Sequence, residues 1–364
     1  MKTLTAATIF ACAAAVWANQ EVPAQDPKIL LPGDKAPAIK VAKYYQGQEI
    51  KAFEKGKVYV VEFWATWCGP CIESIPHLND LSIKLKGKAE FVGVNIWDEE
   101  DGQDARISGF VKKMAAKMSY RVAVDTPQMD MTSKWMEASY SDGIPTAFII
   151  NQEGLVAWIG HPMEIETPLM QVVEKKFDIT AARTAREAEV KKQIEQNELL
   201  DQITGAEELY KQGKKDEAIK ILDALAENET VGGNAKMAKL GLYAGDNIPA
   251  AKEMIKSMAK GEFGDIANLA FFSYEQAIDK AGNRELAVFT SDQILENLKH
   301  DDALVLFSIA PAYSVTGEHK KALEILNRAL KAFDSSPYAQ DEQMKSLRKE
   351  IENAAAKEKA AIGG

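Results

Sequence analysis

Residues 58–71 read VYVVEFWATWCGPC, and this stretch decides what fold the chain adopts around it. An apolar, β-rich run leads into a turn and then into a helix that starts at the first of two cysteines. Backbone N–H groups at a helix N-terminus stabilise a thiolate, which is the form of cysteine that attacks a disulfide. The two-residue spacing lets Cys71 reach back to Cys68 and close a ring. The stretch therefore predicts reversible thiol–disulfide exchange, in which Cys68 attacks and Cys71 resolves.

Zinc binding is the alternative use of a Cys-x-x-Cys pair. A structural zinc site needs four ligands, which usually come from two such pairs. The chain has three cysteines, and the third, Cys12, lies in a segment that we expect to be removed. His77 follows Cys71 in the predicted helix by about 600° of rotation, at roughly 100° per residue, so it does not share a face with the pair. The pattern favours redox chemistry and predicts no metal.

A single carboxylate interrupts the apolar run before the cysteines. In a strand, Val58, Val60 and Glu62 share one face of the sheet. Burial of Glu62 there would be unfavourable for its charged form and would raise its pKa, and a group that titrates near neutral pH can pass protons. The alternative is a glutamate that reaches the edge of the sheet and has no role. We favour the catalytic interpretation.

Other segments have the spacing of a known family. They are FVGVNIWD at residues 91–98, Pro76, and GIPT at residues 143–146. Together with residues 63–71 they resemble thioredoxin, and more closely the TlpA-like branch of exported thioredoxin-fold proteins, over residues 32–178. The resemblance implies an α/β domain with a mixed sheet of four or five strands and helices on both faces. We expect no cofactor.

The resemblance also implies roles for individual residues. Glu62 occupies the position of the buried acid beneath the disulfide, where it would take the proton of Cys71. The Ile144–Pro145 bond would be cis, as few X–Pro bonds are, and Ile144 would pair with an extended substrate beside Cys68. We expect Trp67 to be exposed near the thiols as a substrate contact, and Trp64 to be partly buried. Trp97 and Asp98 are weaker candidates for the rim of the site.

The pattern predicts the elements of this domain in order. We expect strands at 58–63, 90–96, 147–150 and 155–160, helices at 69–86 and 165–177, and a helix with a short strand between 103 and 124. The last segment resembles the insertion of TlpA-type proteins. Pro76 would kink the helix that carries Cys71. A peroxiredoxin site is disfavoured, because Thr66 lies two residues before Cys68 and the peroxide pocket needs three.

The N-terminus resembles an export signal. Residues 1–18 carry one positive charge near the start, then an uncharged apolar run, and the small-residue pattern Val16-Trp17-Ala18 predicts cleavage before Asn19. The run is short for a membrane span, which favours cleavage over an uncleaved anchor. Residues 19–31 would be a linker. The protein would then be periplasmic or secreted.

The net charge and the cysteine count limit the classes of partner and the sources of stability. The net charge is −10, and it becomes −11 without residues 1–18 because one lysine is lost. This acidity argues against nucleic acid and anionic membrane surfaces as partners. An exported chain that used disulfides for stability would carry more cysteines, so packing must stabilise it. Its length is sufficient for two hydrophobic cores.

The pattern changes near Thr180 to one dominated by alanine, lysine, glutamate and leucine. A glycine precedes an alanine by five residues four times, at Gly213, Gly245, Gly282 and Gly317. The period near 34 residues resembles tetratricopeptide repeats, in which helix pairs stack and bind proteins. Residues 179–364 are therefore predicted to be an α-helical repeat domain that binds a protein partner. The alternative is an irregular helical bundle.

These observations favour an exported thiol–disulfide oxidoreductase that reduces protein or peptide disulfides. Gly69-Pro70, the dipeptide between the thiols, is the thioredoxin pair and suggests a reductant. Export to an oxidising space would require a membrane-bound thiol as electron donor. Two alternatives stay open: a scaffold protein whose redox domain regulates docking, and a disulfide isomerase if the protein is dimeric.

Overall fold

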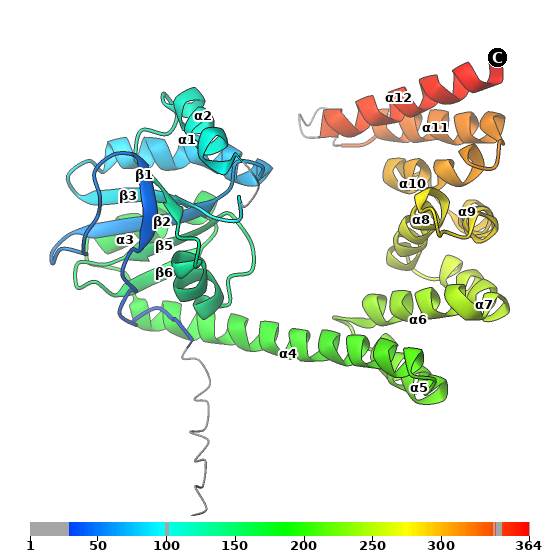
Figure 1. Ribbon diagram of the computed structural model, residues 1–364, viewed down its shortest axis with the longest axis horizontal. Coiled ribbons are helices and arrows are strands. Elements are labelled where there is room, and N and C mark those ends of the chain that lie inside the picture. Colours follow the sequence, from blue (N-terminus) through cyan, green and yellow to red (C-terminus); the bar gives the residue numbers. More distant parts are fainter. Residues whose placement is uncertain (1–28, 99–101, 338, 340–343, 364) are drawn as a thin grey trace, which may run out of the picture. The chain divides into compact units, whose positions relative to one another are not determined.

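A computed structural model describes residues 29–98, 102–337, 339 and 344–363. The chain divides into two compact units between Gln193 and Ile194 (Figure 1). The predicted signal peptide and most of the predicted linker lie outside the described residues. Among the residues that are described, no helix is both long and apolar enough to cross a membrane.

The first unit is built on one mixed sheet of six strands in the order β1-β4-β3-β2-β5-β6. The strands are β1 (Val41–Gln46), β2 (Val58–Trp64), β3 (Ala89–Asn95), β4 (Arg121–Asp125), β5 (Thr146–Ile150) and β6 (Val156–Gly160). β2 is parallel to β3 and antiparallel to β5, so it is central. The expectation of four or five strands was too low, because β1 adds an edge strand antiparallel to β4. Its residues VAKYYQ are half exposed and lack the apolar run that marks an inner strand.

The central strand separates two hydrophobic cores. Every residue of β2 is buried. Val58, Val60 and Trp64 pack into one core, and Tyr59, Val61 and Phe63 pack into the other. This alternation is the period of two that a strand imposes, and it puts Glu62 on the face of the first core.

Helices cover the first of these faces. They are α1 (Gly69–Lys84), α2 (Gln103–Met114) and α3 (Glu166–Val173), and each contributes buried aliphatic side chains to the first core. The π-helix η1 (Thr132–Met136) packs on the opposite face through Trp135 and Met136, and the 3-10 helix η2 (Glu137–Ser139) follows it. A further 3-10 turn, η3, spans Pro162–Glu164. The prediction of an α/β thioredoxin-like domain is confirmed, and α3 is shorter than expected.

The second unit is entirely helical over its described residues. It contains the end of α4 (Ile179–Lys211), then α5 (Lys215–Ala226), α6 (Gly232–Asp246), α7 (Ile248–Ala259), α8 (Phe263–Ile278), α9 (Arg284–Asn297), α10 (Ala303–Ser314), α11 (His319–Asp334) and α12 (Met344–Gly363). The four glycines of the predicted repeat lie at or next to four helix–helix turns. Gly213 and Gly317 have positive φ angles there, of 89° and 84°, which only glycine adopts without strain. An all-helical second domain is therefore confirmed.

Helix α4 begins where residue 179 was predicted to open the second domain. The division between the compact units, however, lies 15 residues further along this helix. Ile203, Ala206 and Tyr210 of the same helix belong to a hydrophobic core with α5 and α6. One continuous helix of 33 residues thus contributes to both units.

Candidate active site

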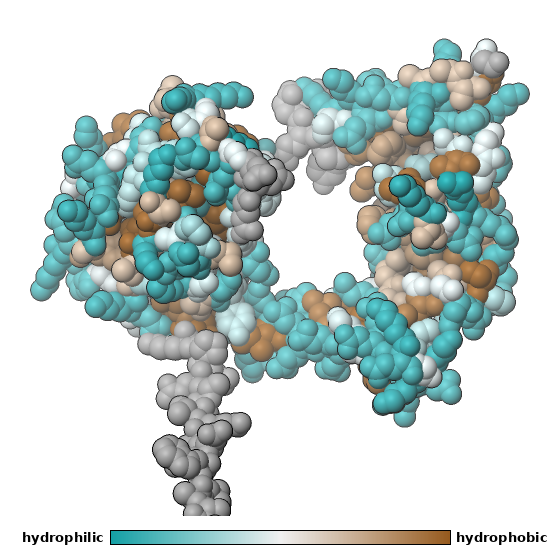
Figure 2. Space-filling view, viewed as in Figure 1, coloured by the Kyte–Doolittle hydropathy of each residue, from teal (hydrophilic) through white to brown (hydrophobic). Residues whose placement is uncertain are grey.

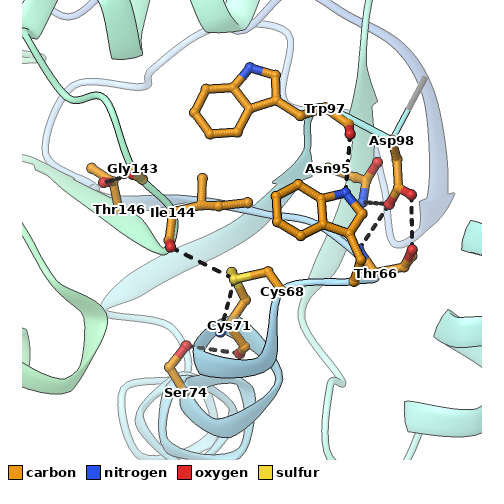
Figure 3. The surroundings of a disulfide bond; sticks show 11 residues. Thr66, Cys68, Cys71, Ser74, Asn95, Trp97, Asp98, Gly143, Ile144 and Thr146 are labelled. Carbon is orange, nitrogen blue, oxygen red and sulfur yellow. Dashed lines mark hydrogen bonds between the residues drawn. A yellow bond between two sulfur atoms is a disulfide. The ribbon is translucent and has the colours of Figure 1, made fainter. Parts of the chain in front are cut away.

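The two cysteines lie at the start of α1, after β2 and the turn that follows it (Figure 3). They form a disulfide, with an S–S distance of 1.98 Å and Cα atoms 5.2 Å apart. Cys68 is the N-cap residue of α1, and its Sγ accepts a hydrogen bond from the backbone N–H of Cys71 at 3.2 Å. Cys68 is 5% exposed whereas Cys71 is fully buried. The first turn of the helix therefore directs the Cys71 N–H at the sulfur of the less buried cysteine.

Glu62 lies in the middle of β2 and is 1% exposed. Its neighbours across the sheet are Gly93 on β3 and Ala147 on β5, two small residues that leave room for its side chain. Neither carboxylate oxygen has a hydrogen-bond partner in the structure. Burial raises the pKa of Glu62 to about 8. The alternative of a glutamate at the sheet edge is wrong, because β2 is the central strand.

The side chains of Glu62, Trp64 and Tyr120 converge on Gly93. A Cβ atom at Gly93 would lie 2.9 Å from Glu62 Oε2, 3.2 Å from Trp64 Nε1 and 3.2 Å from a ring carbon of Tyr120. The Trp64 indole and the Tyr120 hydroxyl are, like Glu62, buried without a hydrogen-bond partner. Burial and the nearby Glu62 charge raise the pKa of Tyr120. Only glycine at position 93 lets the carboxylate and the two rings approach this closely.

The loop that precedes β5 faces the disulfide. The Ile144–Pro145 peptide bond is cis, as the resemblance implied. The Ile144 carbonyl oxygen lies 3.7 Å from Cys68 Sγ, and Figure 3 shows it directed at this sulfur. The Thr146 hydroxyl donates a hydrogen bond to the Gly143 carbonyl at 2.7 Å and so closes the loop.

Tryptophan side chains lie on the other side of the cysteines. Trp67 is 62% exposed, and its indole N–H donates to the Trp97 carbonyl at 3.1 Å. Trp97 has a φ of 58°, an uncommon conformation for a bulky residue. Trp64 is completely buried, so the expectation of partial burial was wrong.

A buried carboxylate fixes the turn before Cys68. Asp98 accepts hydrogen bonds from the backbone N–H and the hydroxyl of Thr66, at 2.8 and 2.9 Å, and from Asn95 and Arg106, at 2.9 and 3.0 Å. Burial alone would raise the pKa of Asp98, but these hydrogen bonds outweigh it and lower the pKa. Sequence reasoning assigned Asp98 only to the rim and missed its partners. A signal was present, since Asn95 ends a parallel strand and Asp98 follows it by three residues.

The structure thus brings together the residues that the sequence singled out. Cys68 and Cys71 pack into the core on the face of the sheet that carries Glu62, and the Ile144 carbonyl lies beside the Cys68 sulfur. Trp67, next to Cys68 in the chain, is exposed. A thiol pair at a helix N-terminus can exchange two electrons and two protons with a disulfide. The fold and the site define a thioredoxin-like domain with a dithiol–disulfide centre.

Comparison with known proteins identifies the family. The Redoxin family matches residues 31–175. The thiol:disulfide interchange protein HelX of Rhodobacter capsulatus is 31% identical over 160 residues, which cover 43% of this chain and 80% of HelX. The chain belongs to the redoxin-domain family of thiol-disulfide oxidoreductases.

Other relatives match the same part of the chain. FixW of Rhizobium leguminosarum is 30% identical over 39% of this chain and 66% of its own length. A solved thiol:disulfide interchange protein of the thioredoxin family from Chlorobium tepidum is 25% identical, covering 38% of this chain and 96% of that one with a TM-score of 0.31. The chain spans about two thirds of the length of the first curated relatives it matches.

Proposed function

We propose that this protein is an exported thiol-disulfide reductase that acts on disulfides of other proteins. The observation that carries this function is the thiol pair at the start of α1, with the sulfur of the less buried cysteine, Cys68, beside the Ile144 carbonyl. Ile144 and Pro145 would hold an extended substrate segment through the backbone, and the exposed Trp67 ring would contact it. No cofactor takes part.

Catalysis starts from the reduced thiol pair. The Cys68 thiolate attacks one sulfur of the substrate disulfide, so that a Cys68–substrate bond forms and the substrate S–S bond breaks. The second substrate sulfur leaves as a thiolate and takes up a proton. The N–H of Cys71 and the N-terminus of α1 stabilise the negative charge on Cys68 before the attack.

The second step releases the substrate. The Glu62 carboxylate accepts the proton of the Cys71 thiol, and the Cys71 thiolate attacks Cys68 Sγ. The Cys68–substrate bond breaks, the substrate sulfur leaves as a thiolate and takes up a proton from water, and two electrons have passed to the substrate. Because burial raises the pKa of Glu62 to about 8, this acid can bind and release a proton near neutral pH.

The direction of electron flow follows from the residues between the thiols. Gly69-Pro70 is the dipeptide of reducing thioredoxins, and we expect a reduction potential on the order of −270 to −200 mV. With residues 1–18 as an export signal, the protein would work in the periplasm or outside the cell. A membrane-bound dithiol would then have to return it to the reduced form.

Reduction of insulin tests this function. The reduced full-length protein is expected to reduce insulin disulfides catalytically in the presence of dithiothreitol. Its reduction potential, measured by equilibration with a glutathione or thioredoxin couple, should lie between about −270 and −200 mV. The physical reason is that Cys68 is accessible and Cys71 is positioned to close the ring. A potential near that of strong oxidants, about −120 mV, would contradict the reductase assignment.

Oligomeric state separates the reductase from an isomerase. Light scattering of the same sample is expected to give a monomer. A dimer that also restores activity to scrambled ribonuclease would support the isomerase alternative instead.

A second role, protein binding, is proposed for the helical unit. Phe271 and Ile278 are two turns apart on α8 and more than half exposed, as is Leu304 on the neighbouring α10. Figure 2 shows apolar surface among the polar surface of this unit. The proposal rests on these exposed side chains, because a contiguous apolar patch on a surface marks a protein-binding site. Tetratricopeptide-like stacking would present them to a partner on the repeats.

A fragment of residues 179–364 is expected to fold alone. Its cores consist of α4–α12 side chains, so circular dichroism should show a helical spectrum and a cooperative melt. It should reduce no insulin, because both thiols lie in the other unit. An unfolded fragment would exclude an independent binding module.

A further inference from the structure

The first half of α4 binds residues 139–142, which lead into the loop that faces the disulfide. Arg186 Nη2 donates to the carbonyl oxygens of Ser139 and Tyr140, at 2.8 and 3.4 Å, and contacts Ser141 Oγ at 3.1 Å. About two helical turns after Arg186, Gln193 Nε2 donates a hydrogen bond to Asp142 Oδ2 at 2.8 Å. Both residues belong to the first compact unit. Four consecutive loop residues, 139–142, are thus bound by two side chains of one helix.

The Arg186 guanidinium is a built contact of this unit. Its side chain is 11% exposed, and its Nη1 also pairs with Glu189 one turn further along α4, at 2.7 Å. A planar guanidinium can bind several acceptors in one fixed geometry, which the point charge of a lysine cannot. The hydrogen bonds of Arg186 to residues 139–141 therefore fix where the loop backbone lies relative to α4.

The loop needs such support because of its backbone conformation. Tyr140 has φ 55° and ψ 38°, a left-handed conformation that a residue with a side chain adopts only when its surroundings enforce it. The Tyr140 N–H donates to the Glu137 carbonyl, and the Ser141 N–H donates to the Met136 carbonyl. Arg186 binds the carbonyl side of the same turn. The direction in which the chain leaves Ser141 is thereby set from both sides.

The bound residues continue directly into the substrate-facing loop. Asp142 is followed by Gly143, Ile144 and Pro145, and the Ile144 carbonyl is 3.7 Å from Cys68 Sγ. Only one residue, Gly143, separates Asp142, which Gln193 binds, from Ile144 with this carbonyl. A displacement of Ser141 or Asp142 is therefore expected to move the Ile144 backbone as well.

We propose that Arg186 and Gln193 are positioning residues for the substrate-binding loop, and that α4 is a working part of the oxidoreductase site. The domain that carries out the reaction then extends to about residue 193 rather than ending at 178. The same helix continues to Ile203 and Tyr210, which belong to a core of the helical unit. This inference rests on the proposed function, which assigns substrate binding to Ile144.

Arg183 is a matched control on the same helix. It also binds the first unit, but at the Pro32 carbonyl, at 3.1 Å, and at Asp34, at 3.4 Å, far along the chain from the Ile144 loop. Removal of Arg183 weakens the docking of α4 without touching residues 139–142. A difference between the two arginine variants therefore isolates the loop from the docking of the helix as a whole.

Steady-state kinetics of the full-length protein tests the inference. Arg186→Ala is expected to raise KM for a protein disulfide, insulin, about tenfold and to change kcat less than about twofold, because ordering of the loop affects binding and leaves the thiols in place. Arg186→Lys should lie between the variant and the wild type. Reaction with the small disulfide 5,5′-dithiobis(2-nitrobenzoate), which needs no strand beside Ile144, should be unchanged.

Two further variants keep the result decisive. Gln193→Ala removes a contact near the surface without a buried charge, and we expect it to raise KM for insulin about twofold even if Arg186→Ala fails to fold. Arg183→Ala should leave KM near the wild-type value. Equal KM values for the two arginine variants, or an unchanged KM for both Arg186→Ala and Gln193→Ala, would overturn the inference. A wild-type protein inactive on insulin and on the small disulfide would overturn the proposed function itself.

Discussion

Cys71→Ser is expected to accumulate a covalent complex between Cys68 and its substrate and to lose multiple turnover. Cys68 has the accessible sulfur and the helix N-terminus, so its attack survives, whereas nothing resolves the mixed disulfide. An intramolecular thiol acts at an effective concentration far above that of a free thiol in solution. Turnover should therefore fall about a thousandfold or more.

Non-reducing electrophoresis with mass spectrometry measures the complex. Cys68→Ser is the control, and it should form no complex because the attacking sulfur is absent. If Cys68→Ser formed the complex and Cys71→Ser did not, the roles of the two thiols would be reversed.

Glu62→Gln is expected to change both stability and turnover in a pH-dependent manner. The pKa of Glu62 is raised from an ordinary value of 4.5 to about 8 in the folded protein. Between these two values the unfolded chain loses this proton while the folded protein keeps it, so the wild type loses stability as the pH rises from 4.5 to 8. Glutamine carries no charge and avoids this loss.

The size of the effect follows from the shift. Relative to the wild type, the free energy of unfolding of Glu62→Gln should rise between pH 5 and pH 8.5 by about 3 to 5 kcal/mol. Urea unfolding of the oxidised proteins measures it, because the disulfide keeps thiol ionisation out of the comparison. Glu153→Gln, in the exposed β5–β6 turn, is the control and should follow the wild-type pH profile. Parallel curves for Glu62→Gln and the wild type would mean that the carboxylate is not charged differently in the folded state.

The same variant should slow the resolving step at neutral pH. Without the Glu62 carboxylate, the Cys71 thiol has to lose its proton by another route, while attack by Cys68 is unaffected. Rapid mixing of the reduced variant with substrate should show normal formation and slow decay of the mixed disulfide. An unchanged decay rate from pH 6 to 9 would remove Glu62 from the mechanism.

The domain order and most elements of the first unit were predictable because their signals are local. The apolar run of residues 58–63, the helix start at the cysteines and the hairpin turn before β6 each occupy a few consecutive residues. The edge strand β1 was missed because half-exposed polar residues carry no such signal. Its strand conformation comes from pairing with β4, about eighty residues later in the chain.

The site divides in the same way. Cys68 and Cys71 are visible from spacing, and Glu62 is visible because a lone acid interrupts an apolar strand. The partners of these residues are not visible, because each contact joins distant segments. Gly93 and Ala147 make room for Glu62 across the sheet, Asp98 binds the turn at Thr66, and Arg186 binds a loop 45 residues before it.

The sequence by itself therefore determined the redox chemistry and the α/β domain followed by helices, and it indicated the residues proposed for the reaction. These depend on side-chain type and on periods of two or a few residues along the chain. Only the tertiary structure decided that Glu62 is buried on the central strand, that Asp98 anchors the turn, and that α4 holds the loop beside the sulfur. Those facts depend on strand order and helix docking, which the whole packed core selects and which no short pattern encodes.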